Sequence, residues 1–366
     1  MTAFVESCVQ TAAGQAQAAN RGARGKPRAR KLLRTLADKK RILVTTHVHP
    51  DPDALASSLA LCELLSTRLK NATVHMSIKG QIGGGINDAF TRHADLHLVP
   101  WNDAALQDYD AIVLLDTQPM FAYSPLPAGV IPTAVIDHHT VRGRRTKCTF
   151  TDVRPDVGAT SSIVFSYFME LEEKISPKLG ATLLYAIETD LAGAAGTPTA
   201  LDNMALSSLT LIADTHTLYQ MRYVDLPQSY YAAYASALNH AVYYDQAMIS
   251  HIGTIDSLEK PAVMADFLLR YDKVTWALIT AIYDGKLILS LRTNGPKDST
   301  GDVMRRLVRN IGDGGGHRTK AGGHIPLETG SAAEIERIRT TLRRRLLRVL
   351  KIRMSRGQKL IPKIEA

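Results

Sequence analysis

The stretch Arg41-Ile-Leu-Val-Thr-Thr-His-Val-His-Pro-Asp-Pro-Asp-Ala54 joins a short apolar run to a group of polar side chains. The run at 41–46 has the length and the β-branched content of a strand buried in a parallel sheet. Apolar residues then recur at helical spacing through residues 54–69. We therefore expect a strand, a polar turn and a helix, the unit from which open parallel sheets are built.

The same pattern returns along the chain. Short apolar runs predict buried strands at 73–78, 111–116 and 133–137, and helical patterns follow at 159–173 and 178–188. This alternation indicates a doubly wound α/β domain with a parallel sheet. A different pattern comes later: a strand near 248–255, a hairpin turning at Asp284-Gly285, a helix at 302–310, a glycine loop at 312–316 and a final amphipathic helix. The later part predicts a smaller α+β domain.

The domain limits follow from these patterns. Residues 1–27 are rich in Ala, Gln, Gly and Arg without sustained periodicity, and they predict a disordered basic tail. We expect the first domain at 28–215, a helical linker at 216–245, the second domain at 246–350 and a basic C-terminal tail at 351–366.

Composition argues against several classes of protein. The 366 residues, 45% of them hydrophobic, allow two globular domains. No apolar run approaches the roughly 18 residues of a membrane helix, and no secretory signal is recognisable at the N-terminus, so we expect no membrane contact. Cys8, Cys62 and Cys148 have no CxxC spacing. They argue against a disulfide framework and a structural zinc site, and they fit a cytoplasmic protein.

The positive charge is confined to the two ends. Residues 1–41 carry ten Lys or Arg against two acids, and residues 330–366 carry eleven against three, so the part between them is acidic although the net charge is +9. An acidic middle with clustered Asp and His suits a site that collects divalent cations. The basic ends could approach RNA or another anion, but a solvated tail and an exposed helix face are the more ordinary explanation.

Acids and histidines follow the ends of several predicted elements. Each one alone would be an ordinary helix cap or a hydrogen-bonded structural residue. Ligands of open α/β sheets bind at the carboxyl ends of the strands, where so many like charges would be costly without cations. Carboxylates and imidazoles without thiolates favour Mn²⁺ or Mg²⁺, and two such ions would clamp a phosphoryl group and activate water. The positions are His47, Asp51, Asp53, Asp116, Asp137, His138, His139 and Asp190.

In this order the motifs resemble those of a known superfamily. The segment HVHPDPDA at 47–54, the Asp that ends AIVLLD, the DHH triplet at 137–139 and the later Asp190 resemble the four motifs of the DHH phosphoesterases. The segment GGGHRTKAGG at 314–323 resembles the glycine-rich signature of the DHHA1 domain. The resemblance covers roughly residues 30–350, and it implies a hydrolase that acts on phosphoric ester bonds.

The resemblance also implies a role for each matching residue. His47 and Asp51 would ligate one metal ion, Asp53, His138 and Asp190 would ligate the other, and Asp116 would bridge the two. Asp137 would orient a histidine ligand, and His139 would contact the substrate phosphate and assist proton transfer. In the second domain the phosphate or terminal nucleotide would be bound by Arg292, Gly314, Gly315, Gly316, His317 and Arg318.

Among DHH proteins, the chain resembles the nano-RNases that also dephosphorylate 3′-phosphoadenosine 5′-phosphate. We therefore expect an oligoribonuclease or exonuclease with two divalent ions, Mn²⁺ first and Mg²⁺ second, acting on short nucleic acids or on small nucleotides such as linear or cyclic dinucleotides. After Asp190 the chain lacks the Thr-Gly and nearby aromatic residue of many such relatives, so the substrate stays open. A pyrophosphatase or polyphosphatase and a non-catalytic nucleotide- or RNA-binding protein are the alternatives, and a homodimer is one option for the assembly.

Overall fold

The structure is a computed structural model that describes residues 27–80, 82, 86–140, 147–191, 198–295, 299–316, 319–354 and 356–362. Within these ranges the residues up to Val224 form one compact unit, and those from Asp225 onward form a second. The tail expected at 1–27 lies outside the described residues except for Pro27, and so do His317 and Arg318. A search of the described helices finds none with the length and hydropathy of a membrane span.

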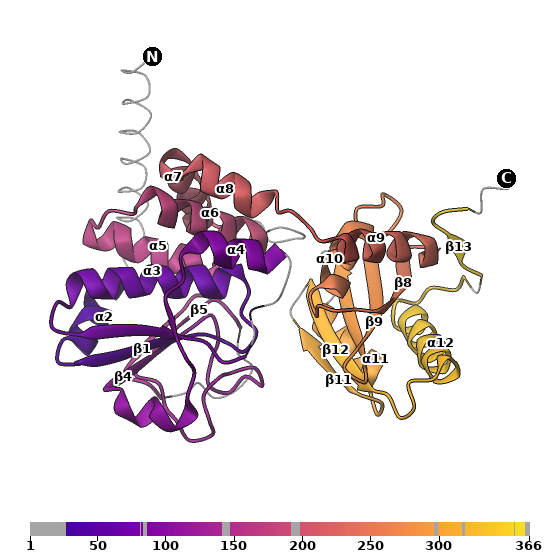
Figure 1. Cartoon of the computed structure of the whole chain (residues 1–366), viewed down its shortest axis with the longest axis horizontal. Coiled ribbons are helices and arrows are strands. Elements are labelled where there is room, and N and C mark those ends of the chain that lie inside the picture. The colour runs from indigo at the N-terminus through magenta and orange to yellow at the C-terminus, as the bar shows by residue number, and fades with distance from the viewer. Residues whose placement is uncertain are drawn as a thin grey trace, which may run out of the picture. The chain divides into compact units, whose positions relative to one another are not determined.

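A six-stranded parallel sheet lies at the centre of the first unit (Figure 1). Its strands run in the order β3-β2-β1-β4-β5-β6, and every neighbouring pair is parallel. Because the strands are parallel, the turns that follow β1, β4 and β5 meet at one edge of the sheet. The strands are β1 (Arg41–Thr45), β2 (Thr73–Ser77), β3 (Leu98–Val99), β4 (Ala111–Leu115), β5 (Ala134–Asp137) and β6 (Phe150–Val153).

Both faces of this sheet are buried, which explains its nearly continuous apolar runs. In β1, Ile42 and Val44 join a large core beneath α3, α5 and α6, whereas Leu43 joins a smaller core on the other face with Leu106 of η1. The helices of this unit are α2 (Arg28–Leu36), α3 (Pro52–Arg68), α4 (Ile86–Ala94), α5 (Thr160–Leu171), α6 (Pro177–Leu191), α7 (Ala200–Ile212), α8 (Thr215–Arg222) and the 3₁₀ helix η1 (Asp103–Asp108).

The second unit contains a mixed seven-stranded sheet in the order β11-β12-β10-β9-β8-β7-β13. The pair β8–β9 is parallel and the other pairs are antiparallel. The strands are β7 (Val242–Tyr244), β8 (Ala247–Thr254), β9 (Trp276–Tyr283), β10 (Lys286–Thr293), β11 (Asp313–Gly316), β12 (Lys320–Pro326) and β13 (Gln358–Lys359).

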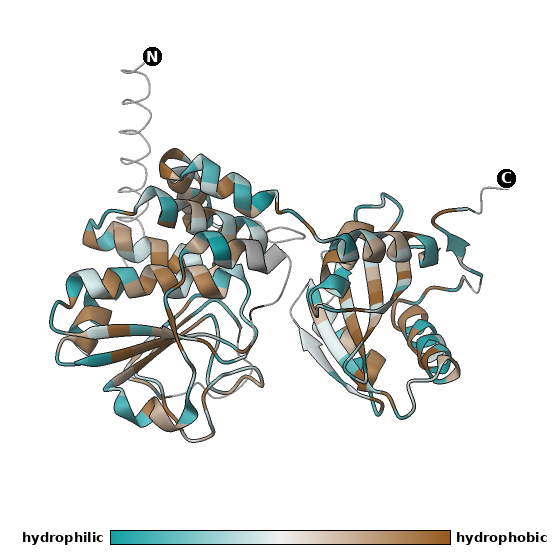
Figure 2. Ribbon diagram, viewed as in Figure 1, coloured by the Kyte–Doolittle hydropathy of each residue, from teal (hydrophilic) through white to brown (hydrophobic). Residues whose placement is uncertain are grey.

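The helices of this unit cover both faces of its sheet. One core contains side chains of α9 (Gln228–His240) and α10 (Lys260–Leu268), and another contains those of α11 (Thr300–Val308) and α12 (Ala332–Val349). Figure 2 shows the strongly hydrophilic residues of α12, while its buried side carries Ile335, Ile338 and Leu342. The α/β fold class with a smaller α+β unit is therefore confirmed. The stretch expected as a helical linker contains α8 of the first unit and α9 of the second.

The predicted glycine loop is wrong, because most of it is strand β11. Gly314 pairs with Gly323 and Gly315 with Gly322 of β12. Close packing against α11 requires glycine on both elements: a Cβ on Gly314 would lie 2.8 Å from the side chain of Met304, and one on Gly301 of α11 would lie 2.2 Å from the carbonyl oxygen of Gly316. Glycine has a low strand propensity, so the local sequence conceals a pairing that tertiary contacts enforce.

Candidate metal centre

The turn after β1 places two of the predicted ligands at the edge of the sheet. His47 follows the strand, and its Nε2 lies 3.6 Å from Oδ2 of Asp116. Asp51 is the N-cap residue of α3, where its carboxylate accepts the N–H of Ala54 at 3.0 Å. An N-cap position leaves the second carboxylate oxygen available for another partner.

Asp53 lies two residues further on, in the first turn of α3, and is only 1% exposed. Its two oxygens accept the N–H groups of Thr160 at 2.7 Å and Ser161 at 2.8 Å. These are the first N–H groups of α5, whose own N-cap residue Ala159 provides no side-chain acceptor. Asp53 therefore caps a helix from 107 residues away in sequence and is held at a fixed place in the site.

Asp116 immediately follows β4 at the centre of the cluster. Its φ of 53° lies in the left-handed region, which costs a non-glycine residue roughly 1–3 kcal/mol and recurs at functional sites. The side chain is 3% exposed, and the hydroxyl of Thr160 donates to its Oδ1 at 2.7 Å. The backbone turn and this hydrogen bond fix the direction of the carboxylate.

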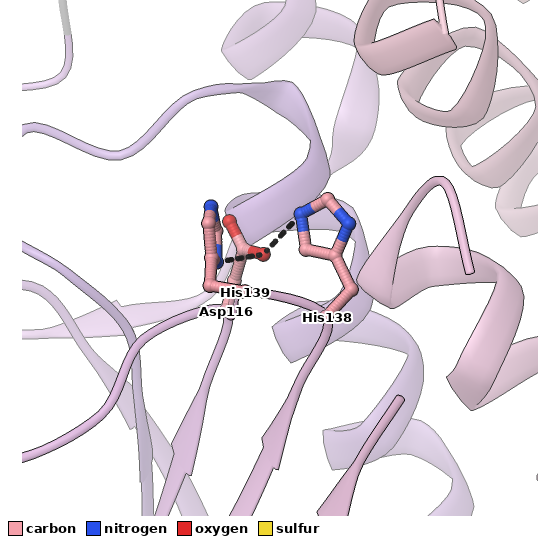
Figure 3. Close-up of side chains that lie close together, drawn as sticks. All are labelled: Asp116, His138 and His139. Atoms are coloured by element: carbon pink, nitrogen blue, oxygen red, sulfur yellow. Dashed lines mark ion pairs between the residues drawn. The ribbon is translucent and has the colours of Figure 1, made fainter. Parts of the chain in front are cut away.

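The DHH triplet ends β5 and brings its two imidazoles to opposite sides of Asp116 (Figure 3). Nε2 of His138 lies 3.5 Å from Oδ1 of Asp116 and 3.6 Å from Oδ2 of Asp190. Nδ1 of His139 lies 2.7 Å from Oδ1 of Asp137 and 3.8 Å from Oδ1 of Asp116. The Asp116 carboxylate is thus approached by His47 after β1, by the two histidines after β5 and by Thr160 of α5.

The backbone sets the tautomers of two histidines. Nδ1 of His47 lies 3.1 Å from the carbonyl oxygen of Val48, and Nδ1 of His138 lies 3.2 Å from that of Val157. A carbonyl oxygen can only accept, so each Nδ1 carries the hydrogen. In the neutral rings this leaves Nε2, the atom nearest Asp116, with a lone pair, as a metal-binding imidazole requires.

Two residues of this centre were missed by the sequence reasoning. Gln118 donates its amide to Oδ2 of Asp137 at 2.6 Å and to the carbonyl oxygen of His139 at 3.2 Å, so it helps to orient the triplet. Thr160 binds Asp116 and Asp53 through its hydroxyl and its N–H. Neither residue belongs to a recognised motif. The one feature of the sequence that could have indicated Gln118 is its position two residues after Asp116.

The electrostatics of the cluster are those of crowded carboxylates. Burial and the neighbouring Asp116 raise the pKa of Asp53 well above its usual range. Burial would also raise the pKa of Asp116, but the hydrogen bond with His47 and the surrounding imidazoles hold it below its usual range. Burial opposes the protonation of His47, yet the carboxylates raise its pKa to about 9, and that of His138 to about 9 as well. Protons on Asp53, His47 and His138 therefore balance the negative charge of the carboxylates, a role that bound cations could take over.

Three overlapping groups of these side chains could each hold a metal ion. In each group the potential ligand atoms lie within 4.8 Å of one another, and Asp116 belongs to two of the three. The donors are carboxylates and imidazoles, which fit Mn²⁺ or Mg²⁺. The groups are His47, Asp51 and Asp116; Asp53, His138 and Asp190; and Asp116, His138 and His139.

The residues predicted in the second domain lie in the second unit. Arg292 is on β10, where its Nε donates to Asp266 at 3.0 Å and where it is the cross-strand partner of Lys320. Gly314, Gly315 and Gly316 lie in β11, an edge strand within the described part of the sheet. An edge strand can present backbone N–H groups on its unpaired side.

Residues 41–187 match a family model described as the DHH family, N-terminal domain. An uncharacterized protein of Methanocaldococcus jannaschii is 30% identical over 307 residues, which are 83% of this chain and 62% of that protein. The chain therefore spans about 62% of the length of this relative.

Two solved structures share the fold. An exopolyphosphatase-related protein from Bacteroides fragilis has a TM-score of 0.67 at 19% identity, covering 88% of this chain and 97% of that one. RecJ from Thermus thermophilus, solved in complex with Mn²⁺, has a TM-score of 0.50 at 14% identity, covering 86% of this chain and 54% of that one. At these identities the likeness concerns the fold alone.

Proposed function

We propose that the chain, whose residues 41–187 match the model of the DHH family N-terminal domain, is a metal-dependent phosphoesterase that hydrolyses short oligonucleotides or small nucleotides. The observation that carries the proposal is that Asp116 is shared between ligand groups at one edge of the sheet. In this proposal His47 and Asp51 hold one ion, and Asp53, His138 and Asp190 hold the other. Mn²⁺ is the first choice, supported by the donor set and by the Mn²⁺ complex of RecJ.

When bound, the ions would supply Lewis acidity and an activated water for in-line attack on phosphorus. The residues around His139 favour the protonated form of its ring, which a proton donor requires. Burial opposes protonation of this ring, but its hydrogen bond to Asp137 raises the pKa of His139. Because Nδ1 lies against Asp137, the proton for a phosphoryl oxygen or for the leaving group would come from Nε2 of this ring.

In the second unit, Arg292, Gly314, Gly315, Gly316, His317 and Arg318 are proposed to bind the phosphate or the terminal nucleotide. A guanidinium can bind a phosphate through two parallel hydrogen bonds, which supports this role for Arg292. Its present partner, Asp266, is exposed and would give way to the phosphate. His317 and Arg318 enter on their sequence position alone.

A substrate panel tests the proposed function. The full chain with Mn²⁺ would be incubated with a linear dinucleotide, a cyclic dinucleotide, 3′-phosphoadenosine 5′-phosphate, pyrophosphate and tripolyphosphate, and phosphate or nucleotide release would be measured. We expect turnover of at least one nucleotide and none after chelation. Turnover confined to pyrophosphate or tripolyphosphate would favour the pyrophosphatase or polyphosphatase alternative. Binding of the nucleotides without any turnover would favour the non-catalytic one.

A further inference from the structure

An open cavity of about 480 Å³ lies in the first unit, at the edge of the sheet where β2 and β3 end. Its lining residues come from the segment that follows β2, from β3 and from the turn after β3. In the sheet, β2 is the neighbour of β1, and β3 is the neighbour of β2. The volume lies in the range of pockets for small molecules, roughly 300–1,000 Å³. The lining is mostly apolar and includes Ile78, Gly80, Ile82, Leu98, Val99 and Trp101.

Gly80 joins this cavity to the metal centre. A Cβ on Gly80 would lie 3.1 Å from the side chain of Val48 and 3.3 Å from Cε1 of His49, and its φ of 91° favours glycine. His49 stands between His47 and Asp51 in the turn after β1. The wall of the cavity therefore packs directly against the turn that carries two of the proposed metal ligands.

Trp101 is held in one orientation. Its indole N–H donates to Oδ1 of Asp103 at 2.8 Å. The ammonium of Lys79 lies 3.0 Å from the same carboxylate and 5.7 Å from the centroid of the indole ring. An aromatic ring fixed in advance loses little conformational freedom when a planar ligand stacks on it.

We propose that this cavity binds the nucleobase of the substrate, with Trp101 as the stacking surface. The inference rests on the proposed phosphoesterase function and names its substrate class as nucleotides instead of inorganic polyphosphates. A nucleobase has an apolar face that suits Trp101 and its aliphatic neighbours, whereas pyrophosphate has none. Lys79 is paired with Asp103, so the ring lies beside a balanced ion pair and the base, not the phosphate, is the part of the nucleotide that this cavity suits.

The two tryptophans of the chain provide a direct readout. Trp276 is 2% exposed in the second unit, whereas Trp101 lines the cavity, so a ligand that quenches the fluorescence reports on Trp101. The full chain in chelator would be titrated with adenosine and adenosine monophosphate, and with ribose 5-phosphate and pyrophosphate as ligands without a base. We expect saturable quenching by the first two alone. Equal quenching by ribose 5-phosphate would overturn the inference.

Variants tested by calorimetry sharpen the result. Trp101→Ala should weaken the binding of adenosine about 10-fold or more, and Trp101→Phe, which keeps a ring, should weaken it less. Tyr219→Ala is the matched control, since this ring is 60% exposed on α8, and it should leave binding unchanged. Adenosine binding that is the same in Trp101→Ala as in the original chain would contradict the proposal.

The assay needs neither metal nor turnover, so the two proposals can fail separately. If adenosine binds at Trp101 but no nucleotide is hydrolysed with Mn²⁺, the base site stands and the phosphoesterase proposal falls. If Trp101→Ala does not fold, the ligand comparison on the original chain and the Trp101→Phe variant decide the outcome.

Discussion

Two of the buried carboxylates of the first unit, Asp152 and Asp116, have different partners. Asp152 is 1% exposed, and Arg154 binds it twice, from Nε at 3.0 Å and from Nη2 at 2.7 Å, while the hydroxyl of Tyr167 donates at 2.7 Å. Asp116 is 3% exposed, and its ion-pair partners among the described residues are histidines, with Asp53 close by.

This difference separates a structural acid from a candidate ligand. An Arg is always charged and matches a carboxylate with two hydrogen bonds, so Asp152 is satisfied by the protein itself. A His is charged only when protonated, so Asp116 depends on protons or on cations from outside. Burial alone therefore does not identify a site; Asp116 is distinguished because its ion-pair partners among the described residues are imidazoles, which can exchange their protons for bound cations.

The largest expected effect comes from replacing the shared carboxylate. Asp116→Ala should lower kcat/KM for a nucleotide substrate by at least about 1,000-fold, because both proposed ions lose a ligand and the phosphoryl charge loses its stabilisation. Steady-state kinetics with Mn²⁺, with circular dichroism to verify folding, would measure it. Near-normal activity in a folded Asp116→Ala variant would refute the proposed bridging role.

The matched change at the other carboxylate should affect stability instead. Asp152→Ala leaves the Arg154 charge and the Tyr167 hydroxyl without their partner, which should cost about 3–5 kcal/mol of unfolding free energy. Urea unfolding would measure the loss, and the specific activity of the folded fraction should stay within about twofold. A selective loss of activity at unchanged stability would place Asp152 with the functional acids and remove the contrast.

A smaller effect is expected from the amide that orients the triplet. Gln118→Leu should lower kcat by roughly 10- to 100-fold with little change in KM, since Asp137 and His139 lose a hydrogen-bond donor but no ligand is removed. Gln107→Leu, at an exposed position of η1, is the control and should have no effect. Equal kinetics of the two variants would mean that Gln118 does not position the triplet.

The smallest expected effect concerns stability without metal. Asp53→Asn removes a carboxylate whose pKa is raised by burial and by Asp116, but its amide keeps only one of the two oxygens that accept the N–H groups of Thr160 and Ser161. These two changes oppose each other, so the metal-free melting temperature should move by no more than roughly 2–4 °C, about 1 kcal/mol in a domain of this size. The same variant should lose most of the stabilisation that Mn²⁺ gives the original chain, about 2.7 kcal/mol for one site at 100 times its Kd. Differential scanning calorimetry with and without Mn²⁺ measures both, and a variant that Mn²⁺ stabilises as strongly as the original chain would contradict the role of Asp53 as a ligand.

Much of the first unit could be predicted from local patterns. Strands β1, β2, β4 and β5 read as apolar runs because both faces of the sheet are covered, and helices α3, α5 and α6 show helical spacing. Strands β3 and β6 were not predicted. The two-residue β3 is too short to carry a period, and β6, Phe150–Val153, alternates buried with half-buried residues over only four positions.

The second unit was harder to predict where glycine replaces side chains. The hairpin at Asp284-Gly285 was predictable, because the Asp-Gly pair is typical of a two-residue hairpin turn in which both residues have positive φ. The structure shows positive φ at both residues. Strands β11 and β12 contain five glycines between them, and no side-chain periodicity marks their pairing. Their position depends on the approach of α11, which the local sequence does not encode.

The residue types and the order of the candidate ligands can be read from the sequence alone, because apolar strands and the polar residues after them are adjacent in the chain. The DHH resemblance came from that order. The tertiary structure decided which acids are paired by arginine, that Thr160 and Gln118 hold the centre, and that Trp101 lines a cavity beside it. The contacts of Gln118 and Thr160 join residues from 19 to more than 100 positions apart, so only packing in three dimensions brings them together.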